Sequence, residues 1–289
     1  MRNIWVLAQM TFLEAVRRRI LLAGLVLGLC FLIIYSLGFH FIFSQARLDE
    51  AVAIQTDPSQ QAVAHIADIE GVNTLLLAGL YAVTFLSIAM AALLAADTLA
   101  GEVASGTIQT IITKPIRRSD VLLGKWLGFA FLLGLYLLLM AGGTVLSVLI
   151  QSGYLPHHLL AGLSLIYFEA LLVMTISMAC SSAFSALATG GIVFGLYGLA
   201  FIGGWIEQFG AIIQNPTAIK VGIIASLIIP SESLWRRAAF EMQTPLAGAL
   251  GISPFGTVSI PSRLMIAYTA VYLLATLIIA IRVFEKRDV

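Results

Sequence analysis

Long apolar runs separated by polar segments dominate the chain. A helix needs about 20 apolar residues to cross the hydrocarbon core of a bilayer. Six runs approach or exceed this length, and we expect them to be membrane-spanning helices: residues 20–43, 74–96, 126–150, 159–182, 186–205 and 264–281. Within lipid, every backbone polar group must find a partner inside the protein, which favours helices for such runs. The pattern therefore predicts an all-α fold, with residues 1–289 forming one transmembrane domain.

Residues 1–19 show a shorter amphipathic pattern. Apolar side chains recur on one face at helical spacing, while Glu14, Arg17 and Arg18 lie on the other face. This pattern predicts a helix on the membrane surface, with Trp5 and the arginines touching lipid headgroups. The alternative is a simple basic flank to the first span.

Residues 206–263 form a long segment before the sixth span. Its apolar stretch, residues 221–229, is too short to cross a bilayer and is ended by Pro230. The sequence SESLWRRAAFEM follows, and it predicts a short amphipathic helix with Trp235 at a membrane interface. We therefore expect a re-entrant or interfacial helix pair on the outer face. The alternative is a seventh span over residues 211–229, although a lysine and an Asn-Pro break within it argue against this.

Composition supports the membrane class. Hydrophobic residues make up 60% of the chain and charged residues 11%, whereas soluble domains have about 25% charged residues. The distribution of basic residues then predicts the orientation, because loops on the cytoplasmic side carry more Lys and Arg. Most basic residues fall on one side if both termini are cytoplasmic: Arg2, Arg17, Arg18, Arg19, Lys114, Arg117, Arg118, Lys125, Arg282, Lys286 and Arg287.

The cytoplasmic segment between the second and third spans, residues 97–125, is rich in helix starts and stops. Gly106 suits a helix end, and residues 107–113 form a short apolar and threonine-rich piece. Pro115 stops that piece, and Ser119 is a candidate N-cap for the next helix. The pattern predicts a short rigid helix that projects from two spans, as a docking element would.

This segment does not match a nucleotide-binding loop. A phosphate-binding loop requires the pattern GxxxxGK[ST]. Here Ser119 stands where the first glycine should be, and Trp126 follows Gly124 and Lys125. We therefore expect no cofactor on this chain. If ATP drives the protein, ATP and Mg²⁺ bind to a partner subunit.

The stretch EVASGTIQTIITKPIRRSDVLLGKW, together with the tail FEKRDV, resembles permeases of the ABC-2 exporter type. A weaker resemblance links PSESLWRRAAFEMQ to the subgroup that includes nitrous oxide reductase maturation permeases. The resemblance implies a prokaryotic cytoplasmic membrane, two copies of a separate ABC ATPase, a second permease that is identical or homologous, and contact with membrane lipids. It implies no nucleic acid partner. The residues it assigns to ATPase coupling are Glu102, Gly106, Thr107, Ile108, Ile111, Lys114, Pro115, Arg117, Arg118 and Lys125.

Two further features could serve transport. Glu169 is an acid inside a predicted span, at a depth where a charge is costly unless it is paired or wet. It either faces a pathway or is a protonated acid bonded to a neighbouring helix. The glycines of the fifth span let helices approach closely. Gly191, Gly195 and Gly198 are candidates for a two-subunit interface, and packing within one subunit is the alternative.

A different class of function would also use Glu169. An intramembrane enzyme could combine this acid with His157 and His158, and a channel-like protein could use it to line a pore. However, the sequence offers neither a nucleophile paired with a base nor spacing typical of metal ligands. We therefore expect no catalytic residues and no metal site, and the permease hypothesis is favoured.

Overall fold

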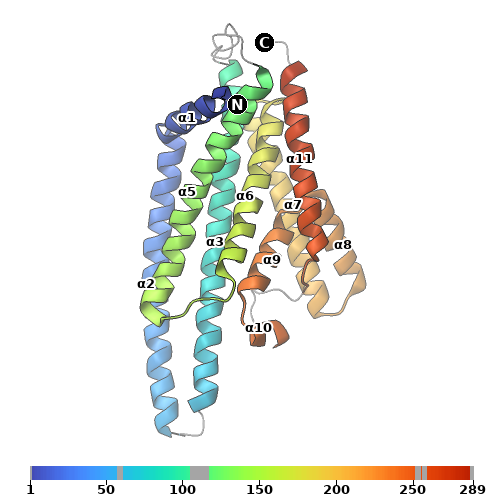
Figure 1. Cartoon of the computed structure of the whole chain (residues 1–289). Coiled ribbons are helices and arrows are strands. Elements are labelled where there is room, and N and C mark those ends of the chain that lie inside the picture. The colour runs from blue at the N-terminus through green and yellow to red at the C-terminus, as the bar shows by residue number, and fades with distance from the viewer. Residues whose placement is uncertain (1, 57–60, 105–116, 251–254, 256–258, 287–289) are drawn as a thin grey trace.

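The computed structural model describes residues 2–56, 61–104, 117–250, 255 and 259–286, and this part of the chain is all-helical. Figure 1 shows a bundle of long helices, with α1 and the C-terminal end of α11 at the same end, which we call the terminal end. The helices are α1 (Arg2–Val16), α2 (Arg19–Thr56), α3 (Gln61–Ala104), α5 (Arg118–Ser152), α6 (Leu159–Ser181), α7 (Ala186–Ile212), α8 (Pro216–Ile228), α9 (Ser231–Met242), α10 (Pro245–Leu250) and α11 (Arg263–Lys286).

Among the described residues, six helices are long and apolar enough to cross a membrane: α2, α3, α5, α6, α7 and α11. This confirms the predicted number of spans. The helices α2 and α3 are much longer than the expected spans, at 38 and 44 residues. At 1.5 Å per residue these lengths correspond to about 57 and 66 Å, about twice the thickness of the hydrocarbon core. Both therefore continue as a helical hairpin beyond the other helices, at the end opposite to α1 (Figure 1).

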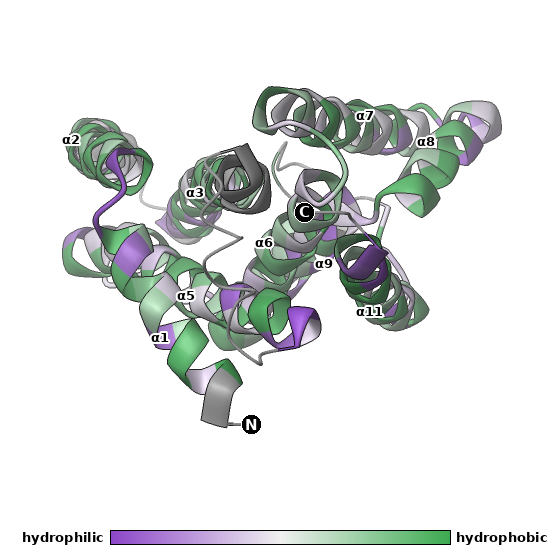
Figure 2. Cartoon of the chain, turned by 90° about the horizontal axis from the view of Figure 1, so that it is seen from above, coloured by the Kyte–Doolittle hydropathy of each residue, from purple (hydrophilic) through white to green (hydrophobic). Residues whose placement is uncertain are grey.

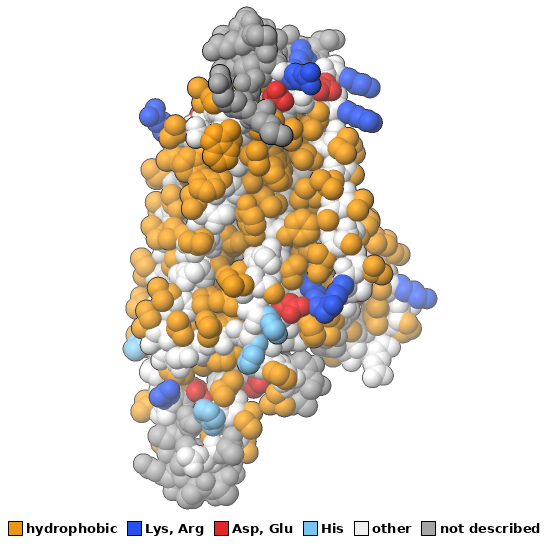
Figure 3. Space-filling view, in the orientation of Figure 1, with side chains coloured by type: hydrophobic (Ala, Val, Ile, Leu, Met, Phe, Trp, Pro, Cys, Tyr) orange, Lys and Arg blue, Asp and Glu red, His pale blue; other side chains and the backbone are white. Residues whose placement is uncertain are grey.

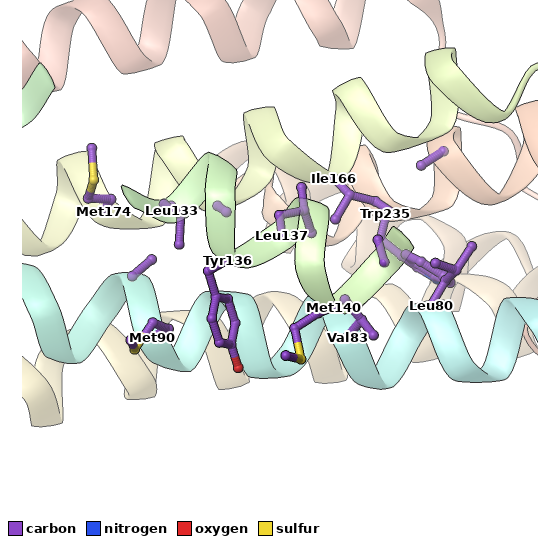
Figure 4. Packing of buried hydrophobic residues seen from close by; sticks show 14 of the residues in the cluster. Leu80, Val83, Met90, Leu133, Tyr136, Leu137, Met140, Ile166, Met174 and Trp235 are labelled. Atoms are coloured by element: carbon purple, nitrogen blue, oxygen red, sulfur yellow. The ribbon is translucent and has the colours of Figure 1, made fainter. Parts of the chain in front are cut away.

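The core of the bundle lies between α3, α5, α6 and α9. Figure 4 shows Leu80 and Val83 of α3 and Leu137 and Met140 of α5 in one packed cluster, with Trp235 of α9 nearby. In the apolar stretch of α3, 61% of the residues are buried, against 11% in that of α2. The view from above places α2 and α8 at opposite edges (Figure 2). The helix α3 is therefore central, and α2 is peripheral.

Apolar side chains cover most of the visible surface. Figure 3 shows them as a broad band along the bundle, with charged side chains near the terminal end and along the lower half. Exposed apolar residues on α2, such as Ile34 and Phe41, belong to this surface. In water such a large apolar surface would be unfavourable, whereas in lipid it is the expected outer face of a membrane protein.

The helix α1 is distinct from α2 and lies against α5. The break between them follows Val16, and the buried face of α1 includes Ala8, Thr11 and Ala15. Trp5 is 65% exposed and is not part of this face. The close packing depends on Gly128, where an added Cβ would lie 2.7 Å from the carbonyl oxygen of Ala8. The N-terminal helix therefore packs against α5 at the terminal end of the bundle, with Trp5 largely exposed (Figure 1).

Candidate functional site

The helix pair α8–α9 forms a bent element before the last span. The two helices meet at an angle of 109°. The 13 residues of α8 span about 20 Å, which is less than the hydrocarbon core. We therefore describe the pair as re-entrant. The sequence correctly predicts two short helices separated at Pro230. It also predicts an interfacial position for Trp235, and this is wrong. Trp235 is 3% exposed and belongs to the core.

The helix α9 lies inside the bundle rather than on its surface. It packs against α6, with further contacts to α3 and α7. Nine of its residues are buried: Ser231, Glu232, Ser233, Leu234, Trp235, Arg236, Ala238, Ala239 and Met242. Four of these nine have polar or charged side chains. The amphipathic pattern that predicts a surface helix arises here because the polar face of α9 meets polar groups of neighbouring helices.

The first of these polar contacts is an ion pair between Arg236 of α9 and Glu207 of α7. Two contacts join the side chains, with 2.6 Å between Nη1 and Oε1 and 2.9 Å between Nη2 and Oε2. Ser259 donates a hydrogen bond to Glu207 Oε1 at 2.6 Å, and Arg236 Nη2 donates to Ser226 Oγ at 3.2 Å. The pair therefore joins α7, α8, α9 and the segment before α11.

A second polar group lies one turn earlier on α9. Tyr81 of α3 donates a hydrogen bond to Glu232 Oε1 at 3.4 Å and accepts one from Trp205 Nε1 at 3.3 Å. Glu232 Oε2 is buried and has no hydrogen-bond partner within the described part of the chain. Burial raises the pKa of Glu232 to about 7, and the nearby Arg236 and the Tyr81 hydroxyl limit this rise. Burial therefore favours the uncharged form of Glu232 more strongly than in an exposed glutamate.

Glu169 of α6 faces the same region. Its side chain is fully buried, and neither carboxyl oxygen has a hydrogen-bond partner among the described residues. It interacts electrostatically with Glu232 of α9, and with Tyr81 and Tyr197. The acid that the sequence singles out therefore influences Glu232 across the packed helices α6 and α9. Tyr81 and Tyr197 extend this electrostatic interaction to α3 and α7.

The predicted coupling residues are only partly described. Gly106, Thr107, Ile108, Ile111, Lys114 and Pro115 lie outside the described residues. Glu102 lies in the last turn of α3, and its side chain is likewise outside the description. Arg117 is exposed and precedes α5, which begins at Arg118. Ser119 is thus the second residue of the helix, and the prediction that it forms the N-cap is wrong.

Two other coupling candidates have partners within the chain. Arg118 Nη1 donates a hydrogen bond to the carbonyl oxygen of Glu285 at 3.2 Å, which ties the start of α5 to the end of α11. Lys125 is 5% exposed and is packed within the bundle. Its neighbour Gly124 lies directly against α1, because an added Cβ would be 2.6 Å from Leu7 Cβ. The Gly-Lys pair therefore has a packing role at this end of the bundle.

The glycines of α7 lie on two different faces. Gly203 and Gly210 pack against α8, where an added Cβ would lie 2.2 and 2.7 Å from alanine side chains. In contrast, Gly191, Gly195 and Gly198 have no atom within 4 Å of such a Cβ. Packing against α8 within one subunit therefore accounts for Gly203 and Gly210. It does not account for the three glycines that the sequence assigns to a subunit interface.

Sequence reasoning did not identify Glu207, Glu232 and Arg236 as a site. A signal was present, because each is a charged residue in or beside an apolar segment where charges are costly. That signal was weakened by the position of Glu232 and Arg236 in a segment that reads locally as a surface helix. Only the tertiary structure shows that Arg236 of α9 pairs with Glu207 of α7.

The six spans and the re-entrant pair define a polytopic membrane protein. The sequence matches the family described as ABC-2 family transporter protein over residues 5–289, and the chain belongs to this family. It is also similar to proteins named probable ABC transporter permease protein NosY. The match is 41% identical over 66 residues with the protein from Pseudomonas aeruginosa, covering 23% of this chain and 24% of the relative.

A second relative of the same name, from Stutzerimonas stutzeri, is 38% identical over 65 residues, covering 22% of this chain and 24% of the relative. Each alignment therefore spans about a quarter of the curated relative. These matches are consistent with the subgroup resemblance. The assignment of this chain as a transmembrane permease rests on the family match over nearly its whole length.

Proposed function

We propose that this permease forms one half of an export path through the cytoplasmic membrane of a prokaryote, with both termini in the cytoplasm. A second permease, identical or homologous, forms the other half. Two copies of a separate ATPase bind ATP and Mg²⁺ and drive the transport. The observation that carries the pairing is the open face of α7, where a Cβ added at Gly191, Gly195 or Gly198 would meet no atom of another described element within 4 Å. Small residues on an open face allow two helices to approach closely in lipid.

The coupling to an ATPase is supported by the position of the segment between α3 and α5. Both helices contribute to the packed core, and α3 is the most buried of the six spans. A force applied at residues 105–116 would therefore reach the centre of the bundle through rigid helices. Movement of packed helices as rigid bodies is a common route from ligand binding at one site to change at another.

Glu169 and Glu232 are the proposed pathway residues. Within the described part of the chain, each has a buried carboxyl oxygen without a hydrogen-bond partner, and they lie on α6 and α9, which pack against each other. A carboxyl group in this position contacts cargo or takes up a proton when the helices move. Replacement of Glu169 by Gln keeps its size and removes its charge. If cargo transport survives Glu169→Gln, this role for Glu169 is excluded.

Cysteine cross-linking tests the pairing. In a background in which Cys30 and Cys180 are replaced by Ala, Gly195→Cys should form a disulfide-linked dimer upon oxidation in membranes. Gly142→Cys is the matched control, because Gly142 is also exposed and a Cβ added there would meet no atom of another described element within 4 Å, but it lies on α5. Equal dimer yields at both positions would indicate random collision. No dimer at Gly195, Gly191 or Gly198 would contradict an interface on this face.

A further inference from the structure

A small, partly open cavity is lined by residues of α3, α7 and the start of α9. Its lining residues are Tyr81, Trp205, Gln208, Glu232, Trp235 and Phe255. It leaves about 10 Å³ for the centre of a water-sized particle, which is close to the minimum for one water molecule. The cavity therefore has room for one small polar group and excludes bulky ones.

None of the described residues that line this cavity is positively charged, although Arg236 of α9 lies close enough to lower the pKa of Glu232. Glu232 is 4% exposed, and its Oε2 has no hydrogen-bond partner in the described structure. Arg236, one turn further along α9, is held by Glu207 through two contacts. A buried carboxylate without a partner is unfavourable, because the charge loses its hydration and gains no hydrogen bond in return. A small cation with hydrogen-bond donors would remove that cost.

The remaining walls are mainly aromatic. The ring centroids of Tyr81 and Trp235 are 4.8 Å apart, and those of Tyr81 and Phe255 are 6.0 Å apart. Trp205 adds an indole whose N–H is directed to the Tyr81 hydroxyl. Aromatic rings attract cations through their negative faces, and tryptophan does so most strongly. Aromatic rings around a free carboxyl oxygen favour an organic cation over an anion or an apolar group.

We propose that this cavity binds the primary ammonium group of an alkylammonium compound. The –NH₃⁺ group is about the size of a water molecule and carries three N–H donors, so it can donate to Glu232 Oε2. The group could belong to a lipid headgroup or to a soluble amine. Binding requires only this chain, so the proposal can fail or hold independently of ATPase coupling.

Two tryptophans in the cavity wall provide the measurement. Replacing Trp5 and Trp126 by Phe leaves Trp205 and Trp235 as the only tryptophans in the chain. The purified protein in detergent and amine-free buffer is titrated with methylammonium at constant ionic strength. We expect a saturable change in tryptophan fluorescence. Tetramethylammonium, which exceeds the cavity, and K⁺, which donates no hydrogen bond, should bind at least tenfold more weakly.

Substitutions in the cavity wall test whether the fluorescence signal arises from this cavity. Glu232→Gln should weaken methylammonium binding at least tenfold, and Tyr81→Phe several-fold. Glu241→Gln is the control, because Glu241 lies on α9 but pairs with Arg237 away from the cavity. Circular dichroism verifies that each variant is folded. If Glu232→Gln does not fold, Tyr81→Phe still provides the comparison.

Lipid nanodiscs distinguish the two sources of the ammonium group. Discs containing phosphatidylethanolamine should compete with methylammonium if the ligand is a lipid headgroup, and discs of phosphatidylcholine should not. Equal methylammonium affinity in both kinds of disc assigns a soluble amine. The proposal is overturned if methylammonium gives no saturable signal, if K⁺ or tetramethylammonium binds equally well, or if folded Glu232→Gln and Tyr81→Phe both bind like the parent protein.

Discussion

Arg236 and Glu207 form a two-point ion pair between α9 and α7, and both side chains are almost completely buried. The pair holds the re-entrant helix inside the bundle, because Ser226 of α8 and Ser259 bond to the same two groups. The pair affects the free energy of unfolding mainly because its disruption is strongly unfavourable. Removing one partner leaves the other charge buried and alone.

Arg236→Ala should therefore destabilise the protein by about 3–5 kcal/mol, the range for breaking a buried ion pair. Thermal unfolding in detergent, followed by circular dichroism, measures the change. The control is Arg237→Ala on the same helix, where the Glu241 pair is partly exposed and should contribute at most about 1 kcal/mol. The double variant Arg236→Met with Glu207→Leu should recover most of the lost stability. Equal effects of the two arginine variants would contradict this role for the pair.

Gly128 is required for the close contact between α5 and α1. In Gly128→Ala the new Cβ would lie 2.7 Å from the carbonyl oxygen of Ala8, and a backbone atom cannot rotate away. We expect a loss of about 1–3 kcal/mol, typical of overpacking, and release of α1 from α5. Limited proteolysis of the N-terminal segment, together with thermal unfolding, measures both effects.

The matched control for that prediction is Gly142→Ala, also on α5. Its Cβ would meet no atom within 4 Å, and alanine is a better helix former than glycine by about 1 kcal/mol. This variant should be neutral or slightly stabilised. If both glycine variants behave alike, the helix contact does not depend on the absence of a side chain at residue 128.

Glu232 should make stability depend on pH. Burial raises its pKa in the folded state from 4.5 to about 7, so the folded protein binds more protons than the unfolded chain between these values. Its contribution is therefore most favourable below about pH 4.5 and is lost as the pH rises to about 7. As the pH rises from 5 to 8 in amine-free buffer, the thermal unfolding midpoint of the parent protein should decrease relative to that of Glu232→Gln. If the midpoints of the two proteins change equally with pH, the raised pKa of Glu232 in the folded state is contradicted.

The number and type of spans could be predicted from the sequence because the requirements of a bilayer are local. Length, apolar content and the break at Pro230 identify the six spans and the short helix pair without knowledge of tertiary contacts. The extent of α2 and α3 beyond the membrane could not be predicted in the same way. Residues 44–73 are polar, and polar helices and polar loops differ little in composition.

The buried site depends on contacts that no local pattern encodes. Glu207 and Arg236 are 29 residues apart, and the helix that carries Arg236 looks like a surface helix when read alone. The glycines of α7 illustrate the same limit. Gly203 and Gly195 look equivalent in the sequence, and only the position of α8 shows which one is covered. The sequence thus predicts the spans well and the interior polar contacts poorly.

The most direct test of the proposed function is to measure the ATPase activity that co-purifies with the permease. Affinity-tagged protein is purified from its native membranes, and vanadate-sensitive ATP hydrolysis is measured per mole of permease. We expect the parent protein and the Glu241→Gln control to retain this activity. Glu102→Ala and Gly106→Pro should lose most of it while their thermal unfolding stays unchanged. Full retained activity in both folded variants would contradict coupling through residues 97–125, and absence of activity from the parent protein would contradict a partner ATPase.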